Sequence, residues 1–266
     1  SGSNTYTDPT ILSAGTLEIG GSGKLGGGIY NGAISIASAA SLKYSSSATN
    51  TFQTGAITGD GSITVDGSGQ LFLKGTASTS FTGGVTVTNG TLNGGGNSAA
   101  IGTGGVTLGG SGSTGASFIG GQNFGSVNIT VNTPDSGIHV IGANGAGSGM
   151  VVGAITLNDS DLTLQTWAAG TTAATTVTGG VTGTGNLILN NLSTTTGKVA
   201  LNTAAVNPAG TLTNQGVGTT ANQINANIGA NVTGIIQNSA TCPLILNGAN
   251  TYQGNLTVNA GLVRIS

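Results

Sequence analysis

The sequence Asn250-Thr-Tyr-Gln-Gly-Asn-Leu-Thr-Val-Asn-Ala-Gly-Leu-Val263 decides the fold, because the chain contains it three times in related form. The other copies begin at Asn4 and Thr79 and read NTYTDPTILSAGTL and TSFTGGVTVTNGTL. Each copy predicts a turn, a short strand, a glycine corner and a second strand, and such repetition is typical of solenoids. An aromatic residue precedes a glycine by nine positions in every copy, in the pairs Tyr6 and Gly15, Phe81 and Gly90, and Tyr252 and Gly261.

A second motif recurs as well. The segment Ile57–Val65 (ITGDGSITV) aligns without a gap with Val181–Leu189 (VTGTGNLIL). Runs of β-branched and apolar residues, separated by glycine-rich corners, predict further short strands. These predicted strands are Thr16–Ile19, Ile34–Ile36, Ser62–Val65, Leu71–Leu73, Val85–Val87, Val127–Val131, Ile138–Ile141, Asp161–Gln165, Leu187–Leu189, Leu244–Leu246 and Leu256–Val258.

The composition argues against a helical or an ordinary charged globular protein. Gly accounts for 51 of the 266 residues, and 5% of residues are charged, against about 25% in typical globular chains. No long stretch has apolar residues at the spacing of a helix. Disorder is disfavoured because Val, Ile, Leu and Thr alternate throughout. The sequence therefore predicts an all-β fold.

Repetition distinguishes between a sandwich, a barrel and a β-helix, all of which fit the strand spacing. In a β-helix, inward side chains stack on the same positions of the next coil, about 4.8 Å away. Glycine and asparagine supply the left-handed backbone of its corners. The repeated spacing favours a β-helix. With coils of roughly 20 to 25 residues, residues 1–266 are expected to form one β-solenoid domain of about 11 to 13 coils and about 55 Å.

Few groups are available for catalysis or metal binding, since the chain has one His, one Cys and seven carboxylates. His139 is expected to face outward, because apolar residues flank it in a strand. Cys242 is expected to be a buried, inert thiol, and Asp66, before a glycine, to form a turn. Asp159 and Asp161 are the candidate Ca²⁺ ligands, with a polar turn as the alternative. The sequence predicts no catalytic site and no cofactor.

The charge pattern bears on partners. The net charge is −2 and the five basic residues are scattered, so nucleic acid is not an expected partner. No apolar run approaches the ~20 residues of a membrane helix. A surface with so little charge promotes self-association. The chain begins at Ser1 without a recognisable leader, and we expect either a processed protein or an excerpt of a longer one.

The segment Leu244–Val263 closely resembles the autotransporter-associated β-strand repeat of bacterial passenger domains. Asn231–Thr241 is similar to the lead-in of that repeat, and Ile57–Leu92 resembles it with a two-residue insertion. The resemblance implies a right-handed parallel β-helix, export across a Gram-negative-type envelope, and display as an adhesin, stalk or biofilm matrix component. It brings no catalytic motif. The membrane barrel of autotransporters has no counterpart here, so we expect either its removal or a secreted relative.

The motif copies near the two ends predict how copies associate. Solenoids that stay monomeric end in atypical polar caps, whereas these end segments look like interior coils with open strand edges. The leading hypothesis is a head-to-tail homopolymer in which residues 1–21 contact residues 247–266 of the next copy, and deletion of residues 1–21 abolishes polymers. The residues expected at this interface are Tyr6, Ile11, Leu17, Tyr252, Leu256, Val258, Val263 and Ile265.

Three classes of function remain open at this point. A structural filament or adhesive stalk on the cell surface is favoured. A carbohydrate-binding adhesin is the second, in which aromatic side chains stack on surface glycans. A polysaccharide-active β-helix enzyme is the third, although the scarcity of charged residues disfavours it. The alternative to a filament is that the chain is part of a longer tandem-repeat protein. The repeating unit would then be about 246 residues long, which is the separation of Tyr6 and Tyr252 in the sequence.

Overall fold

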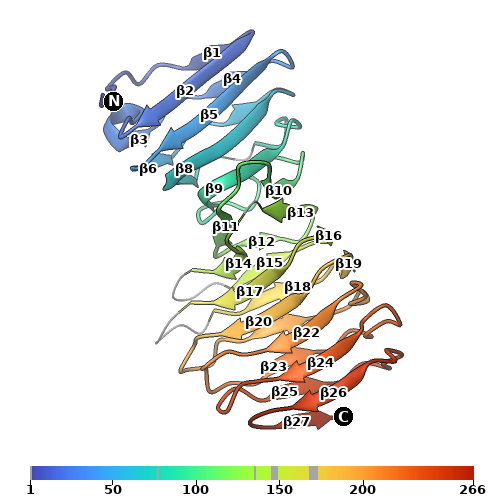
Figure 1. Ribbon diagram of the computed structural model, residues 1–266. Coiled ribbons are helices and arrows are strands. Elements are labelled where there is room, and N and C mark those ends of the chain that lie inside the picture. Colours follow the sequence, from blue (N-terminus) through green and yellow to red (C-terminus); the bar gives the residue numbers. More distant parts are fainter. Residues whose placement is uncertain (1, 77, 135, 145–148, 168–172) are drawn as a thin grey trace. The chain divides into compact units, whose positions relative to one another are not determined.

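The computed structural model describes residues 2–76, 78–134, 136–144, 149–167 and 173–266. It divides into two compact units, Ser1–Gln122 with Pro134–Gly137 and Asn123–Thr133 with Ile138–Ser266. Each unit stacks short parallel strands into a β-solenoid (Figure 1), and the described residues make about 11 turns. The predicted all-β solenoid is confirmed. A single continuous domain stays a prediction.

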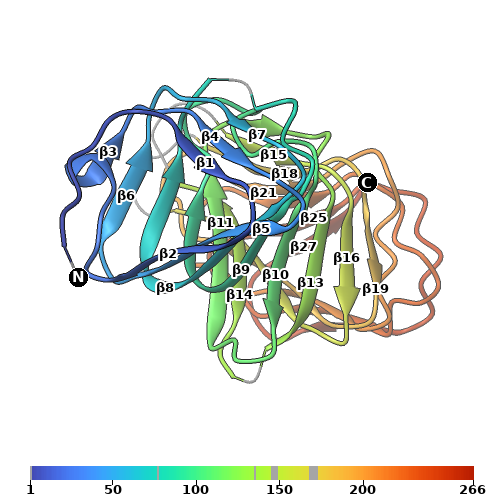
Figure 2. The ribbon, with the colours of Figure 1, turned by 90° about the horizontal axis from the view of Figure 1, so that it is seen from above.

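The first unit contains three-stranded coils. Its strands are β1 (Thr10–Leu12), β2 (Gly15–Gly21), β3 (Ile29–Tyr30), β4 (Ile34–Ile36), β5 (Ala40–Ser46), β6 (Thr49–Phe52), β7 (Ile57–Thr58), β8 (Ser62–Leu73), β9 (Val85–Asn93), β10 (Val106–Gly110) and β11 (Gly115–Gly120), with one short 3-10 turn, η1 (Gly26–Gly28). Strands β2, β5 and β8 lie side by side, and β1 lies beside β4 on another side of the coil (Figure 2).

The second unit repeats this arrangement. Its strands are β12 (Asn123–Phe124), β13 (Ile129–Pro134), β14 (His139–Ala143), β15 (Met150–Val152), β16 (Ile155–Asn158), β17 (Leu162–Thr166), β18 (Thr175–Val177), β19 (Val181–Gly183), β20 (Leu187–Asn191), β21 (Val199–Leu201), β22 (Thr211–Asn214), β23 (Asn222–Ile224), β24 (Gly234–Gln237), β25 (Leu244–Leu246), β26 (Asn255–Val258) and β27 (Val263–Ile265). Every strand run predicted from the sequence overlaps an observed strand, but the separate runs Ser62–Val65 and Leu71–Leu73 are parts of one long strand, β8.

The length of a coil follows from the strand register. In the first unit Ile34 pairs with Ile57, 23 positions later. In the second, Leu187 pairs with Leu212, 25 positions later. These two spacings lie within the 20 to 25 residues expected from the repeats, while other coils depart from that range, from 19 positions between Leu244 and Val263 to 28 between Asn123 and Val151. Because each strand pairs in parallel with its equivalent in the next coil, side chains of one kind form columns along the stack.

Two such columns run through the core of the first unit. Their side chains alternate with outward-facing residues, as the two-residue period of a strand requires. Beyond the first coil all of them are buried. One column contains Leu17, Leu42, Ile63, Val85 and Val106, and the other contains Ile19, Tyr44, Val65, Val87 and Leu108.

A comparable column runs through the second unit, and it corrects one prediction. The column contains His139, Leu162, Leu187, Leu212, Ile235 and Leu256. The prediction that His139 faces outward is therefore wrong, since its side chain is fully buried and its Nε2 lies 3.1 Å from the Asn132 carbonyl oxygen. Strand β14 begins at His139, whereas Ile138 lies in the preceding turn and is 63% exposed. The inward positions are thus counted from His139.

The glycine corners of the motif are confirmed. Gly15, Gly90 and Gly261 all have positive φ, at 78°, 76° and 72°. In the second motif, Gly59 and Gly183 adopt φ of 100° and 91°. Only glycine enters this region without steric cost. The nine-residue spacing of the motif therefore marks the distance between an aromatic residue and a left-handed corner.

A buried polar network also runs along the second unit, in place of apolar side chains. Asn191, Asn214, Asn222 and Gln237 are fully buried. The Asn214 amide donates to Gln237 Oε1 at 2.6 Å and to the Cys242 carbonyl at 2.8 Å, and its oxygen accepts from Asn222 Nδ2 at 2.8 Å. Buried amides of this kind are stable only when their hydrogen bonds are made.

Candidate functional site

The last coil of the second unit has unpaired strand edges. Among the described strands, β26 pairs only with β24 and β27 only with β25. Leu256 and Ile265 continue columns of buried residues, because they stand opposite Ile235 and Leu246. Yet Leu256 is 37% exposed and Ile265 is 69% exposed. Val258 and Leu262 are exposed as well. The final rung of the core is therefore an apolar surface beside two free strand edges.

The first coil of the first unit has a similar edge. Within the described part of the chain, β1 pairs only with β4 and β2 only with β5. Leu17 belongs to a core column but is only half-buried. Ile11, which the sequence places at the interface, is 73% exposed and stands opposite the outward residue Ser35. The edge of β2 also borders a cavity of about 220 Å³, lined by Gly2, Asn4, Leu17, Glu18, Ile19, Gly20, Gly23, Lys24 and Leu25.

The motif aromatics differ in their surroundings. Phe81 is fully buried. Tyr6 is partly exposed and packs edge-on against Tyr30, with ring centroids 5.6 Å apart. Its hydroxyl lies 2.5 Å from Thr10 Oγ1, which is 2.7 Å from the Tyr30 hydroxyl. Tyr252 in the last coil is half-buried. Tyr6 thus binds its own coil to the next one, and its part in an interface stays a prediction.

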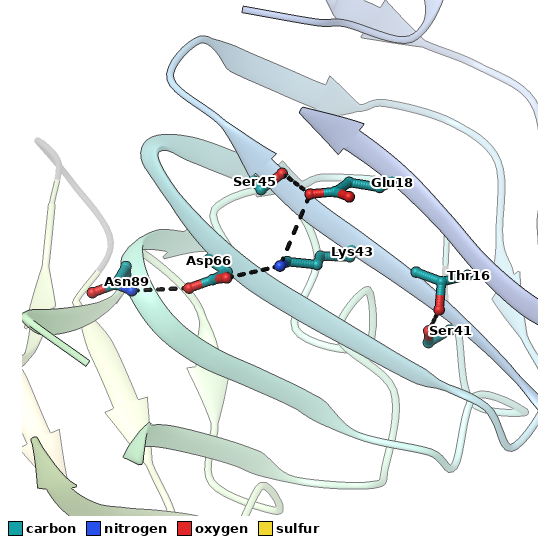
Figure 3. A network of polar contacts seen from close by, with 7 residues as sticks. All are labelled: Thr16, Glu18, Ser41, Lys43, Ser45, Asp66 and Asn89. Carbon is teal, nitrogen blue, oxygen red and sulfur yellow. Dashed lines mark hydrogen bonds and ion pairs between the residues drawn. The ribbon is translucent and has the colours of Figure 1, made fainter. Parts of the chain in front are cut away.

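A ladder of charged and polar side chains crosses the outer face of the first unit (Figure 3). Lys43 Nζ lies 3.0 Å from Asp66 and 3.9 Å from Glu18. Asn89 Nδ2 donates to Asp66 Oδ1 at 2.9 Å, and Ser45 Oγ donates to Glu18 Oε1 at 2.5 Å. These residues come from β2, β5, β8 and β9, so the ladder spans four successive coils. Asp66, predicted to form a turn, instead lies inside β8.

The ladder shifts the pKa values of Asp66 and Lys43. Partial burial alone would raise the pKa of Asp66, but hydrogen bonds from Asn89 and Lys43, with the Lys43 charge, hold that pKa below its usual value. The hydrogen bond to Asp66 raises the pKa of Lys43, and the Asp66 and Glu18 charges add to the effect. The opposite charges of Lys43 and Asp66 therefore favour the charged form of each.

The structure assigns other roles to the candidate metal ligands. Asp161 Oδ1 accepts hydrogen bonds from the backbone and side-chain nitrogens of Asn186, at 2.8 and 2.9 Å. Asp159 occupies a left-handed corner with φ of 50°. The described residues contain no group of three or more His, Cys, Asp or Glu side chains that could hold a metal ion. The geometry of Asp159 and Asp161 therefore does not support a metal site, and Ca²⁺ binding there stays a prediction.

Cys242 is buried, as the sequence predicts. Its thiol donates to the Thr220 carbonyl oxygen at 3.1 Å, and its own carbonyl accepts from Asn214 and Gln237. Burial raises the pKa of the Cys242 thiol. The thiolate is the reactive form of cysteine, so both access and ionisation oppose its reaction.

The expected result is that a disulfide reagent at neutral pH modifies folded Cys242 at least about 100-fold more slowly than the denatured chain, because reaction requires local opening. Absorbance of the released thiol measures both rates. The same reagent in denaturant gives the reference rate for an accessible cysteine. Equal rates in the two conditions would show that the thiol is exposed in solution.

With both end coils described, comparisons with known proteins show what they resemble. Three segments match one family model, at residues 1–19, 63–93 and 244–265. The family is the passenger-associated-transport-repeat. The matches hold 19, 31 and 22 residues, 72 of 266, so they cover about a quarter of the chain. The resemblance to autotransporter passenger repeats is confirmed for these segments. Neither the search of curated proteins nor that of solved structures found a match.

The transport repeats lie at informative places. Two of them contain the exposed end strands, β1 to β2 and β26 to β27, and the third contains the glycine corner at Gly90. A passenger-type repeat implies secretion or display at the cell surface. Among the helices that the structure describes, none is long and apolar enough to cross a membrane.

The sequence analysis did not single out two charged residues of the end strands. Glu18 and Arg264 are both outward positions of exposed end strands. A detectable signal was present, because the two residues directly follow the first and third motif copies, three positions after Gly15 and Gly261. The buried amides left no such signal, since Asn in this chain is also frequent in corners.

Proposed function

We propose that this chain is an exported structural module that polymerises head to tail into a surface filament or stalk. One observation carries the proposal: the apolar columns of the core continue to the end strands, where Leu256 and Ile265 are exposed beside unpaired backbone edges. The match to transport repeats supports an extracellular setting. The partner we propose for this surface is the first coil of a second copy.

The energetic argument rests on the same side chains. The inward residues of β26 and β27 are Leu256, Val258, Val263 and Ile265. Fully burying a Val, Leu or Ile side chain contributes about 1.5–3 kcal/mol, so these four partly exposed side chains offer on the order of 4 kcal/mol when covered. An unpaired parallel edge also presents free N–H and C=O groups that template another strand. The chain has few charges to oppose such contact. Both contributions favour an added coil.

The proposed role is structural rather than enzymatic. Cys242 and His139, the side chains best suited to act as nucleophile and base, are each fully buried inside the second unit. Among the described residues, no observation comparable to the exposed end strands favours a glycan-binding role.

The test compares two aspartate variants of the 266-residue chain, Ile265→Asp and Val217→Asp. Both replace an exposed aliphatic side chain, at 69% and 66% exposure, and both change the net charge equally. We expect unmodified protein to form fibres in near-neutral buffer, Ile265→Asp to raise the critical concentration at least about tenfold, and Val217→Asp to leave it unchanged. Negative-stain microscopy and sedimentation measure these outcomes.

Two results would contradict the proposal. Isolated particles at every concentration of the unmodified chain would show that its ends do not join, as expected if a following segment of a longer protein normally covers β27. Fibres that respond equally to both variants would place the contact elsewhere.

Deletion of residues 1–21, which removes β1 and β2, is expected to abolish fibres.

A further inference from the structure

The exposed strands of the two end coils have the same internal spacing. Residues of β1 and β2 correspond in the repeat to residues of β26 and β27 that come 246 positions later. Leu12, Gly15 and Leu17 thus correspond to Val258, Gly261 and Val263, and both glycines have positive φ. Equal strand spacing and equal corners allow the two edges to pair along both strands.

The side chains of these edges also alternate in the same sense. Leu17 and Ile19 stand opposite the buried Leu42 and Tyr44, so they face the core, while Glu18 is outward. In β27, Val263 and Ile265 stand opposite the buried residues Leu244 and Leu246, and Arg264 is exposed. In both strands the side chains therefore point inward, outward and inward in turn. The outward residue is negatively charged in β2 (Glu18) and positively charged in β27 (Arg264).

We propose that β27 of one copy pairs with β2 of the next in the register Val263 to Leu17, Arg264 to Glu18 and Ile265 to Ile19, with β26 on β1. This proposal rests on the proposed head-to-tail assembly and specifies its register. It adds a cation to the ladder of Figure 3, which then alternates in sign through Arg264, Glu18, Lys43 and Asp66. The two described contacts of Glu18 both use Oε1, which leaves Oε2 for the arginine.

The alternation of inward and outward side chains and the pair of opposite charges exclude different wrong registers of β27 on β2. A slip by one residue would turn the apolar side chains of β27 away from the core, because side chains alternate with a period of two. A slip by two residues would keep that alternation but place Arg264 opposite Thr16 or Gly20. Only the proposed register satisfies both conditions. The ion pair therefore selects the register more than it adds affinity, as expected for exposed charges.

Charge reversal tests the register directly. Glu18→Arg and Arg264→Glu each place like charges opposite each other, and we expect each to raise the critical concentration about fivefold to tenfold at low salt. The double variant, or an equimolar mixture of the two single variants, restores opposite charges at every junction. Both are expected to assemble within about twofold of the unmodified chain. Added salt should reduce all of these differences.

Lys74→Glu is the matched control for Arg264→Glu. Both variants carry a net charge of −4, the unmodified −2 less two for the reversal, and Lys74 is an exposed residue outside both end coils. Melting temperatures below the critical concentration check that each variant is folded. Since Glu18→Arg also disturbs Lys43, the comparison of Arg264→Glu with Lys74→Glu decides the result if Glu18→Arg does not fold.

The outcomes separate the two proposals. Fibres of the unmodified chain, loss in each single variant and recovery in the mixture would support the register. If the unmodified chain forms fibres but Arg264→Glu behaves like Lys74→Glu, or the mixture does not recover, the register is wrong and the assembly stands. If the unmodified chain forms no fibres under any condition, both proposals are overturned.

Discussion

Replacing Asn214 by alanine is expected to lower the free energy of unfolding of the second unit by about 3 kcal/mol or more. The Asn214 side chain makes three hydrogen bonds of 2.6 to 2.8 Å in a fully buried position. Its removal leaves Asn222 Nδ2 without its acceptor and opens a cavity in the column. A buried donor without a partner costs the full desolvation of the group. Urea denaturation followed by circular dichroism measures the change.

Asn225→Ala is the matched control for this effect. Asn225 also belongs to an amide ladder, since it donates to Asn202 Oδ1 at 2.7 Å and accepts from Asn247 at 2.5 Å, but it is exposed. Water replaces those hydrogen bonds when the amide is removed, so the expected loss is below about 1 kcal/mol. If the two alanine variants prove equally stable, burial of the amide network does not hold the unit together.

Replacing Gly90 by alanine is expected to destabilise the first unit by about 3–5 kcal/mol. Gly90 has φ of 76°, and a Cβ there would lie 1.9 Å from the Gly67 carbonyl oxygen of the preceding coil. The obstacle is backbone rather than a flexible side chain, so the coils themselves must separate. Left-handed strain of about 1–2 kcal/mol comes in addition. Thermal and urea unfolding provide the measurement.

Gly15→Ala separates the two contributions. Gly15 occupies the same place in the first motif copy and has nearly the same φ, 78°, but a Cβ there meets nothing within 4 Å. We expect it to cost only the backbone strain, about 1–2 kcal/mol. A Gly90→Ala variant as stable as Gly15→Ala would mean that the stacking distance at this corner is looser than the structure indicates.

Much of the fold was predictable because this chain uses few residue types in repeated places. Glycine with positive φ, strands of alternating residues and coils of about 23 to 25 residues all leave a periodic signal. Of the residues predicted at the interface, Leu256, Val258 and Ile265 are exposed, and their part in an interface stays a prediction. Ile11 differs in orientation, because its partner Ser35 is an outward residue.

The parts that were not predictable lack such a signal. His139 was misjudged because its inward position depends on where β14 begins, which a single strand does not reveal. Asn214 and Gln237 look like loop residues in the sequence, although they occupy inward positions of strands. The contact of Lys43 with Asp66 depends on stacking between coils, and no pair of residues near each other in the sequence indicates it.

The side-chain amide ladders have a consequence for the medium in which the protein works. Asn202, Asn225 and Asn247 join three coils through groups that neither gain nor lose protons, and the buried amides of the second unit do the same inside. Acid denaturation acts mainly through carboxylates and histidines whose protonation changes on unfolding. Hydrogen bonds between neutral amides are not lost by protonation in mild acid, so the stability of these coils depends little on pH. This property suits a protein outside the cell, where the pH is not controlled.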